Sequence, residues 1–211
     1  MRQGPSMISD DIPAPPAPLK KIGKRAQKVQ DRKDHILVTA ARLFRERGYH
    51  AVSMDEIGSA SGMTGPAMYK YFKDKAAILI AILELGTAIA KQAIASIDTT
   101  GLSDLEILAE HVRCYIDFTG ETRDAMVVTV REANNIPEWY RPGFLDEQRT
   151  VREAEVNLLI RIRPELTRSE ARYICTNVFQ GLISSSVYLY PADSENRRLR
   201  LSAMAMAALL A

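Results

Sequence analysis

The stretch TGPAMYKYF, residues 64–72, places a lysine between two tyrosines, shortly after a glycine and a proline. At helical spacing Met68 and Phe72 share one face, so this face is expected to pack inward. Lys70 then points away from the core. An ammonium group and two phenol hydroxyls are hydrogen-bond donors suited to base edges and phosphates, and we interpret this short helix as a DNA-reading element.

The two tyrosines fall on opposite flanks of that helix. Tyr69 and Tyr71 are therefore placed to reach the phosphates on either side of a major groove, while Pro66 and Ala67 join Lys70 on the outer face. Small residues on this face let the helix backbone approach the bases. The alternative is that the tyrosines only cover the edges of a small apolar core.

Two further helices are expected to position this element. A longer helix is predicted over residues 31–47, where apolar residues recur at helical spacing. Ser53 and Glu56 have the spacing of a capping box that opens a second, short helix, and Thr64 is placed to cap the third. This arrangement predicts a helix-turn-helix DNA-binding domain over residues 31–78.

The charge is divided unevenly along the chain. The net charge is +2, but residues 1–75 hold 14 Lys and Arg against 8 Asp and Glu, whereas residues 76–211 hold 14 against 18. The basic part is expected to meet a polyanion. Residues 1–30 are rich in proline and poor in apolar residues, which predicts a disordered basic arm that either reaches DNA or is only a soluble tail.

Other classes of protein are disfavoured by the sequence. The chain lacks both an uninterrupted apolar run of the roughly 18 residues that a membrane span needs and the apolar stretch of a signal peptide, so we expect a cytoplasmic protein. Cys114 and Cys175 are expected to be buried, reduced thiols. The three histidines are scattered, and no catalytic, phosphate-loop or metal-ligand spacing occurs. We therefore expect no enzyme, no metal and no cofactor.

Three spaced patterns occur between residues 36 and 79. The first helix ends in Phe-x-x-x-Gly-Tyr, the second holds Ile-Gly-x-x-Ser-Gly, and the third ends in Tyr-x-x-Phe-x-x-Lys. The residues that carry them are Phe44, Gly48 and Tyr49, then Ile57, Gly58, Ser61 and Gly62, then Tyr69, Phe72 and Lys75. Together they resemble the DNA-binding domain of TetR-family transcriptional regulators. Tyr71 departs from the family, since histidine is common there, and Gly65-Pro66 replaces a frequent charged residue followed by glycine.

The resemblance implies an all-helical homodimer that binds double-stranded DNA. One recognition helix from each subunit would enter successive major grooves of a palindromic operator. Ser53 would place the N-terminus of the second helix near a phosphate. The other implied contacts are phosphate contacts from Arg32, Lys33, Thr64, Tyr69, Tyr71 and Lys75, and base contacts from Gly65, Pro66, Ala67 and Lys70.

Residues 79–211 are predicted to form a helical effector-binding and dimerisation domain. No stretch alternates like a strand, so the predicted fold class is all-α, with an N-terminal three-helix DNA-binding domain and a C-terminal helical domain. Capping boxes and prolines mark the helix ends. The helices are expected over about 75–97, 104–119, 122–134, 143–163 and 167–189, with one more after Pro191.

Apolar and small residues recur at heptad-like spacing in the last two predicted helices. Such stripes usually form a core, whereas in a TetR-like chain they would form a four-helix bundle with the partner subunit. We favour the dimer because two DNA half-sites require two readers. The expected interface residues are Val178, Gly181, Leu182, Ser185, Leu189, Leu199, Ala203, Met206 and Leu210.

The middle helices hold aromatic and apolar residues that could line an effector cavity, and ordinary core packing is the alternative for each of them. The expected effector is a small, largely apolar molecule, on which an acid or thioester group would meet Arg113 or Arg131. The expected lining residues are Arg113, Tyr115, Phe118, Met126, Val127, Val130, Arg131, Asn134, Trp139, Tyr140, Phe144, Asn157 and Phe179.

These expectations combine into a sequence-specific DNA-binding transcriptional regulator. The most direct form is a repressor that a small effector releases from its operator. The alternative is an effector-independent helical protein that binds DNA or a protein partner. Solid packing of the middle helices would favour this alternative.

Overall fold

The computed structural model of the chain describes residues 24–185 and 194–211. Most of the predicted basic arm, residues 1–23, lies outside these ranges. Within them every regular element is a helix, which confirms the all-α fold class. The helices are α1 (Lys24–Arg47), α2 (Met54–Ala60), α3 (Gly65–Met68), α4 (Lys75–Ala95), α5 (Asp104–Glu121), α6 (Arg123–Arg131), the 3-10 helix η1 (Ala133–Asn135), α7 (Arg141–Ile162), α8 (Arg168–Ser185) and α9 (Ser194–Leu210).

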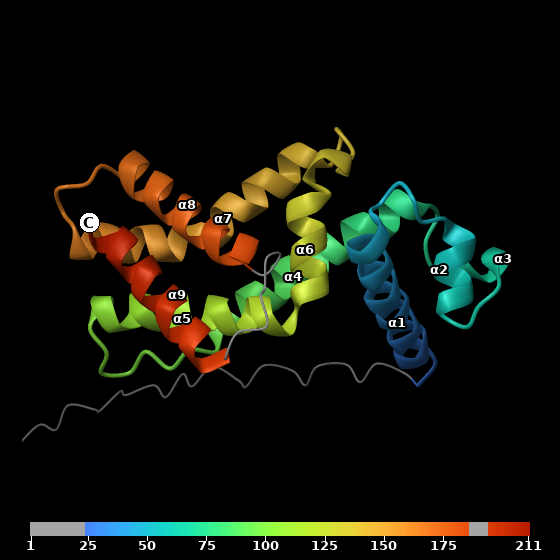
Figure 1. Ribbon diagram of the computed structural model, residues 1–211, viewed down its shortest axis with the longest axis horizontal. Coiled ribbons are helices and arrows are strands. Elements are labelled where there is room, and N and C mark those ends of the chain that lie inside the picture. Colours follow the sequence, from blue (N-terminus) through green and yellow to red (C-terminus); the bar gives the residue numbers. More distant parts are fainter. Residues whose placement is uncertain (1–23, 186–193) are drawn as a thin grey trace, which may run out of the picture.

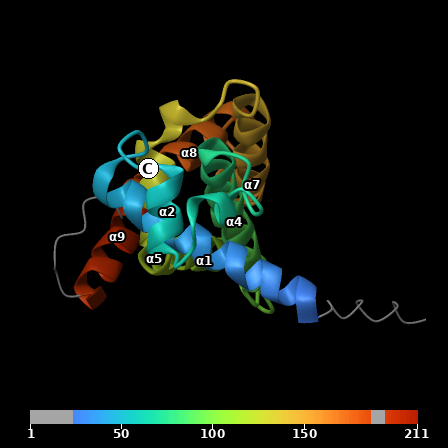
Figure 2. The same ribbon diagram turned by 90° about the vertical axis from the view of Figure 1, so that its right-hand side faces the viewer.

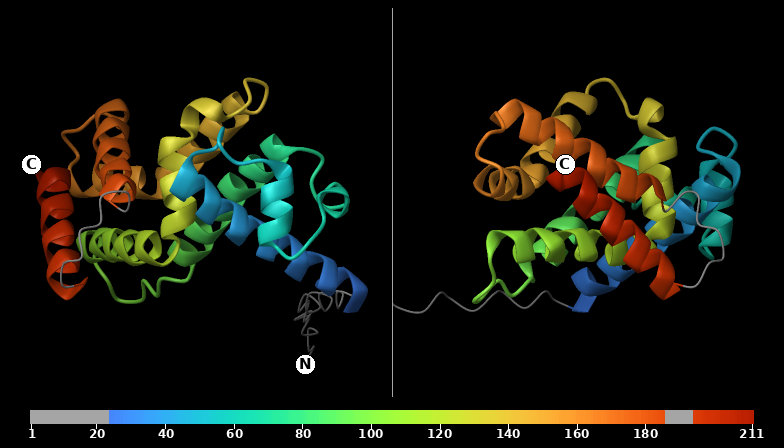
Figure 3. Two further views of the ribbon diagram at one scale, coloured as in Figure 1. Left: turned by 45° about the vertical axis from the view of Figure 1, so that its right-hand side comes forward. Right: turned by 60° about the vertical axis from the view of Figure 1, so that its left-hand side comes forward.

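The helices form two groups that α4 connects (Figure 1). At one end of the molecule α1, α2 and α3 form the helix-turn-helix unit, which Figure 2 shows from its outer side. At the other end α8 packs on α9, and both lie against α5 (Figure 3). The surface that would read DNA and the surface that would meet a second subunit therefore lie at opposite ends of the protein.

The first helix begins earlier than predicted. Residues 24–30 were assigned to the disordered arm, yet they form the first turns of α1. Two side-chain hydrogen bonds at helical spacing support this segment, from Gln27 to Asp31 and from Gln30 to Asp34, each 2.8 Å long. The prolines that argue against a helix all precede these residues, so nothing in the segment itself prevents α1 from starting there.

One hydrophobic core joins the helix-turn-helix unit to the rest of the protein. Ile57 of α2 and Met68 of α3 are fully buried in it together with the inner face of α1. The same core takes in Val128 of α6 and Ile136, which follows η1. The predicted domain boundary at residue 78 therefore falls within a continuous core, to which α4 contributes Ile78, Leu79, Ile82 and Leu83.

A second core lies among α5, α7, α8 and α9. Its centre is Phe179 of α8, whose ring lies 4.8 Å from that of Tyr115 in α5. Cys175, one turn before Phe179, is fully buried, and burial raises the pKa of its thiol to about 12. Cys175 and Cys114 both lie outside any disulfide of the described chain, but Cys114 is only partly buried, whereas the sequence predicted two buried thiols.

α4 alone among the described helices has the length and the apolar composition that crossing a membrane requires. In this fold it is a core helix: it packs on α1, α5, α6 and α7 and contributes residues to both cores. Its apolar character follows from contact with helices on several sides. Because α4 belongs to both groups of helices, a displacement of its C-terminal part would reach the helix-turn-helix unit.

The predicted capping box at the start of α2 is present. The Ser53 amide donates to Glu56 Oε2 at 2.8 Å, and the Glu56 amide donates to Ser53 Oγ at 3.2 Å. Arg47 of α1 pairs with the other Glu56 oxygen at 2.7 Å, which ties α1 to α2. The backbone hydrogen bond from Ser53, followed by the Arg47 contact, lowers the pKa of Glu56 to about 2.

This low pKa predicts a pH-dependent loss of stability. The folded-state pKa of Glu56 lies below its ordinary value of 4.5, so the stabilisation is complete above pH 4.5 and is lost as the pH falls toward 2. Replacing Glu56 with Gln should make the free energy of unfolding, measured with urea, less dependent on pH across this window. Glu46→Gln, also on the surface beside an arginine, is the matched control. Equal pH dependence in wild type and Glu56→Gln would contradict the assignment.

Candidate nucleic-acid interface

The recognition element is short. α3 covers only Gly65–Met68, and the chain continues as a turn through Tyr71. Met68 and Phe72 are buried, so the predicted inner face is confirmed. On the outer side Lys70 is exposed and Tyr69 is 57% exposed. Tyr71 is half-buried and packs against the first core, so its ring does cover a core edge as the alternative interpretation proposed.

Two glycines lie where α2 and α3 approach each other closely. A Cβ atom on Gly65 would lie 1.9 Å from Oδ1 of Asp55 in α2. Gly58 of α2 is similarly constrained, since a Cβ there would lie 2.9 Å from Cγ of Met68. Gly58 therefore has a packing role, whereas a side chain at Gly65 would require the exposed Asp55 carboxylate to turn aside.

The side chains around the start of α3 remain available to a ligand. Thr64 occupies the N-cap position, but its hydroxyl makes no capping hydrogen bond, contrary to expectation. Pro66 lies in the first turn, where its missing N–H is tolerated, and is exposed. Ala67 is half-buried. The exposed part of this surface therefore consists of small side chains flanked by Tyr69 and Lys70.

Basic residues of α1 lie beside this surface. The Lys33 ammonium is 6.0 Å from the centre of the Phe72 ring, which places α1 next to the C-terminal end of the recognition element. Arg32 is exposed one residue earlier. These side chains extend the positive charge of Lys70, as a surface that follows a phosphate backbone requires.

Lys75 has a different role from the one implied by the resemblance. Its Nζ donates hydrogen bonds to the carbonyl oxygens of Tyr49 and Val52, each 2.7 Å away, and more weakly to that of His50 at 3.4 Å. It also lies 4.4 Å from the centre of the Tyr49 ring. Burial lowers the pKa of Lys75. Three acceptors use all three ammonium protons, so Lys75 holds the loop between α1 and α2 rather than a phosphate.

Glu132, which follows α6, holds the same loop from another side. One carboxylate oxygen accepts from the Tyr49 amide at 3.1 Å, and the other accepts from the Asn135 side chain at 2.7 Å. The Asn135 side chain in turn lies 2.7 Å from Nε2 of His50. Glu132 is buried although it is acidic. These residues, which the sequence analysis missed, connect the helix-turn-helix unit to α6.

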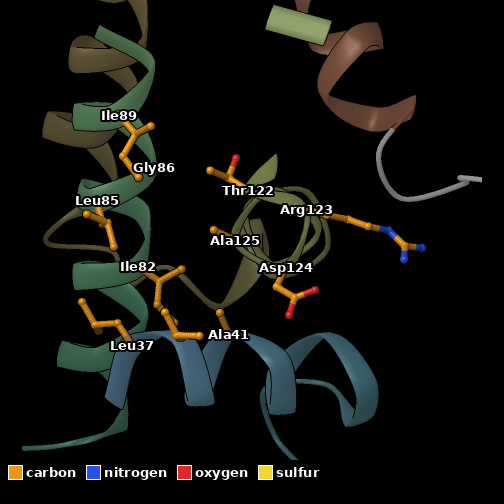
Figure 4. A pocket seen from close by; sticks show the side chains of 11 residues that line it. Leu37, Ala41, Ile82, Leu85, Gly86, Ile89, Thr122, Arg123, Asp124 and Ala125 are labelled. Carbon is orange, nitrogen blue, oxygen red and sulfur yellow. The ribbon is translucent and has the colours of Figure 1, made fainter. Parts of the chain in front are cut away.

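The contact between α1 and α6 has an ion pair at its edge and a cavity on the side that faces α4. Arg45 of α1 pairs with Asp124 of α6 at 2.7 Å. Next to this pair a cavity of about 350 Å³ lies among α1, α4 and the start of α6 (Figure 4). Leu37, Ile82 and Ile89 form part of its apolar wall, and Arg123 points away from it. This space therefore separates part of α1 from α4 and the start of α6.

The space among the middle helices, where an effector cavity was expected, is small. A void of about 30 Å³ lies between α4, α5, α6, α7 and α8, and Tyr115, Phe118 and Met126 line it as expected. Phe179 contacts Tyr115 behind it. Val127 is buried, and Val130 is partly buried against the second core. The void is about the size that one water molecule requires, so an effector there would need the helices to separate.

The predicted polar anchors do not converge on that cavity. Arg113 pairs with Glu110 on α5, and Arg131 reaches the Arg45 carbonyl at 3.5 Å. The remaining predicted residues also make other contacts. The Asn134 carbonyl accepts from Arg141, Asn157 accepts from Arg168, and Tyr140 donates to Glu84. Phe144 belongs to the first core, and Trp139 is 70% exposed, with the Lys73 ammonium 5.8 Å from the centre of its ring.

The α9 part of the predicted dimer interface forms an exposed stripe. Leu199 is 65% exposed, Leu210 is 40% exposed, and Ala203 lies between them. Met206 is half-buried against the second core. Spacing of three to four residues places these side chains along one side of the helix. α9 therefore presents an apolar surface that no part of the described chain covers.

The α8 part of the prediction is less accurate. Gly181 is exposed, but Leu182 is only 1% exposed because it points into its own core, so it is not available to a partner. Tyr173, which was not predicted, is 72% exposed on α8. Val178 and Ser185 are half-buried, and Leu189 lies outside the described residues.

Comparison with known proteins gives matches to the helix-turn-helix unit. Residues 36–82 match the family model described as bacterial regulatory proteins, tetR family. The HTH-type transcriptional activator FasR of Mycolicibacterium smegmatis is 35% identical over 69 residues, which are 33% of this chain and 31% of FasR. The HTH-type transcriptional regulator AcrR of Shigella flexneri is 42% identical over 62 residues, 29% of each chain. The alignments thus span about a third of these relatives. Both are named as transcriptional regulators, in agreement with the expectation that the chain is not an enzyme.

Solved structures share the fold over most of the chain. A tetR-family regulatory protein from Rhodococcus RHA1 has a TM-score of 0.74 at 18% identity and covers 84% of this chain and 96% of its own. AibR, solved in complex with isovaleryl coenzyme A and operator DNA, has a TM-score of 0.70 at 20% identity. The match covers 82% of this chain and 97% of AibR. At these identities the similarity concerns the fold alone.

The contacts of Lys75 predict a structural phenotype. Lys75→Met should lower the free energy of unfolding by roughly 1–3 kcal/mol, because three carbonyl oxygens lose a charged donor. Lys70→Met, an exposed change nearby, should alter it by less than about 0.5 kcal/mol. Urea denaturation of both variants measures the difference. If Lys75→Met kept full stability and only weakened DNA binding with a smaller salt dependence, the phosphate contact implied by the resemblance would be correct instead.

Proposed function

From the premise that the chain is a TetR-family protein, we propose that it is a sequence-specific DNA-binding transcriptional regulator. Its first partner is double-stranded DNA with a palindromic operator. The second proposed partner is another copy of the chain, and the third is a small, largely apolar effector. It acts in the cytoplasm, and repression relieved by the effector is the proposed output.

The exposed recognition surface is the observation that carries this proposal. Tyr69 and Lys70 project from an element whose opposite face is buried, so they have no structural role that would account for them. Thr64 keeps a free hydroxyl beside them. Tyrosine and threonine hydroxyls suit phosphates, whereas a lysine in the groove can donate to guanine O6 and N7. Arg32 and Lys33 contribute further charge, and Ser53 places the start of α2 nearby.

The stripe on α9 supports the proposed homodimer. Two recognition elements must be held at a fixed separation for a palindrome to be read, and each chain supplies only one. Apolar residues such as Leu199 and Leu210 would be covered by the same surface of a second copy, since a two-fold interface pairs a patch with itself. The DNA-reading end remains free because it lies at the other end of the molecule.

Release by an effector would act through α4 and α6. Both helices contribute residues to the second core, and both contact the helix-turn-helix unit. A ligand that separates the middle helices would displace α4 and α6, and this displacement would change the distance between the two recognition elements of the dimer. A coupling free energy of about 1–3 kcal/mol changes operator affinity by roughly 5- to 150-fold, so a modest displacement is sufficient.

The second candidate function has one observation in its favour. The internal void is only about 30 Å³, which agrees with an effector-independent helical protein that binds DNA or a protein partner. The two functions differ in a single property. A regulator of the proposed kind loses operator affinity on adding a ligand, whereas the alternative does not.

Selection of DNA fragments from a random pool tests the proposed function. Fluorescence anisotropy of the selected fragment at two salt concentrations, beside a scrambled fragment, should show saturable binding to a palindrome that is much tighter than to the control. Equal and weak binding of both fragments by protein stripped of bound small molecules would refute sequence-specific recognition.

The recognition surface predicts two different mutant phenotypes. Tyr69→Phe removes a phosphate donor and should weaken binding to all sequences by a similar factor. Lys70→Ala should instead relax the preference at particular base pairs, by about 1–3 kcal/mol of discrimination. Anisotropy titrations against single base-pair variants of the operator separate the two. Uniform weakening by Lys70→Ala, together with a smaller salt dependence, would show that Lys70 contacts phosphate and not a base.

A further inference from the structure

A third cavity, larger than the internal void and next to it, opens among α6, α7 and α8. Its volume is about 380 Å³, within the range of small-molecule sites. Its charged residues are three arginines, Arg149 and Arg152 of α7 and Arg172 of α8, and no acidic residue lines it. Thr129, Thr176 and Gln180 add neutral polar groups. A cavity with this lining is suited to an anion.

Arg152 is the unusual member of this lining. It is only 8% exposed, and its guanidinium lies between two aromatic rings, 4.7 Å from the centre of Tyr115 and 4.3 Å from that of Phe179. Its Nη1 is 3.7 Å from the buried Glu155, too far for a hydrogen bond, and no other acceptor in the described chain meets it. A buried arginine with an unsatisfied donor needs an explanation, and a ligand that supplies an acceptor is one.

The surrounding charges leave the cavity positive. Glu155 faces Arg152 but is shared with His111, whose Nδ1 lies 3.0 Å away. Arg172 pairs with Glu153, which also pairs with Arg168 outside the cavity lining. Arg149 makes no hydrogen bond or ion pair with the described chain. Arginine donates two parallel hydrogen bonds to a carboxylate or phosphate, so Arg149 and Arg172 at the rim suit such a group.

The positive cavity adjoins the internal apolar void. Thr129, Gln148 and Ile183 line both spaces and form the partition between them. The Gln148 side chain donates to Thr87 Oγ1 of α4 at 2.9 Å, which keeps this partition closed. On the far side the void is lined by Tyr115, Phe118 and Met126. A molecule with one charged end and one apolar end would match the two spaces in order.

We propose that the cavity between α6, α7 and α8 binds an anionic amphiphile, with its carboxylate or phosphate at Arg149, Arg152 and Arg172 and its apolar chain directed past Gln148 into the internal void. This specifies the effector of the proposed regulator and so rests in part on that function. It moves the charged anchor from Arg113 and Arg131, which are engaged elsewhere, to arginines on α7 and α8.

The site is placed where binding can reach the DNA-reading end. Ala133 lines the cavity, and the preceding residue, Glu132, accepts the hydrogen bond from the Tyr49 amide. Displacement of Gln148 also releases its bond to Thr87 on α4. Ligand entry would therefore perturb both helices that hold the helix-turn-helix unit.

Isothermal titration calorimetry of the full chain with octanoate, octyl phosphate, octanol and butyrate tests the charge and the tail separately. At least one of the two eight-carbon anions should bind about tenfold or more tightly than octanol, which has the same chain length and no charge. The comparison between octanoate and octyl phosphate shows which head group is preferred. Butyrate should bind more weakly than octanoate because its shorter chain buries less apolar surface.

Three arginine variants locate the head group. Arg149→Gln and Arg172→Gln should each weaken anion binding by about tenfold and leave octanol unaffected. Arg168→Gln is the matched control, because Arg168 pairs with the same Glu153 but does not line the cavity. Its affinity should change by less than about twofold. Arg152 is avoided because its removal would leave Glu155 buried beside an empty space.

Several results would overturn the proposal. These are no saturable anion binding at millimolar concentration, equal affinity for octanol and both anions, equal affinity for butyrate and octanoate, or equal losses in Arg168→Gln and Arg149→Gln. Since no DNA is used, the outcome is separate from the operator test. A chain that binds octanoate but no operator would refute the proposed function and keep this site.

Discussion

The loop between α1 and α2 is the point on which the proposed mechanism depends. Lys75 of α4 binds its carbonyl oxygens, and Glu132 after α6 binds the Tyr49 amide, so two oppositely charged side chains fix one short segment to two different helices. Both charges are partly withdrawn from water, where an ionic hydrogen bond is stronger and its loss costs more. The orientation of α2 and α3, and therefore of Tyr69 and Lys70, follows from this attachment.

A fixed loop makes the helix-turn-helix unit responsive to the rest of the protein. The first core is shared with α4 and α6, so a shift of either helix cannot be absorbed within a flexible linker. The cavity beside Leu37 and Ile82 supplies the free space that such a shift needs (Figure 4). Closely packed interiors change between discrete arrangements, which is how a small displacement at one end becomes a rotation at the other. In a dimer joined through α9 that rotation changes the separation of two readers.

Local signals predicted most of the helices, and contacts between distant segments account for the errors. The capping boxes at Ser53 and Ser103 depend on residues three apart, so they are visible in the sequence and are present in the structure. Lys75 acts on carbonyls more than twenty residues away, and its spacing alone could not show that they surround it. Arg152 is held between aromatic rings of two other helices, a contact that its position in the sequence does not show. Leu182 fits a heptad stripe equally well whether the stripe faces a partner or its own core.

The most direct test of this account compares full and half operators. Glu132→Ala removes the acceptor for the Tyr49 amide without altering any residue proposed to touch DNA. With the Tyr49 amide no longer bonded to Glu132, affinity for the full palindrome should fall toward that for a fragment with one half-site. Half-site affinity should stay unchanged, which would show that the domain remains folded. Wild-type affinity of this variant for the full palindrome would contradict the claim that Glu132 sets the geometry of the two readers.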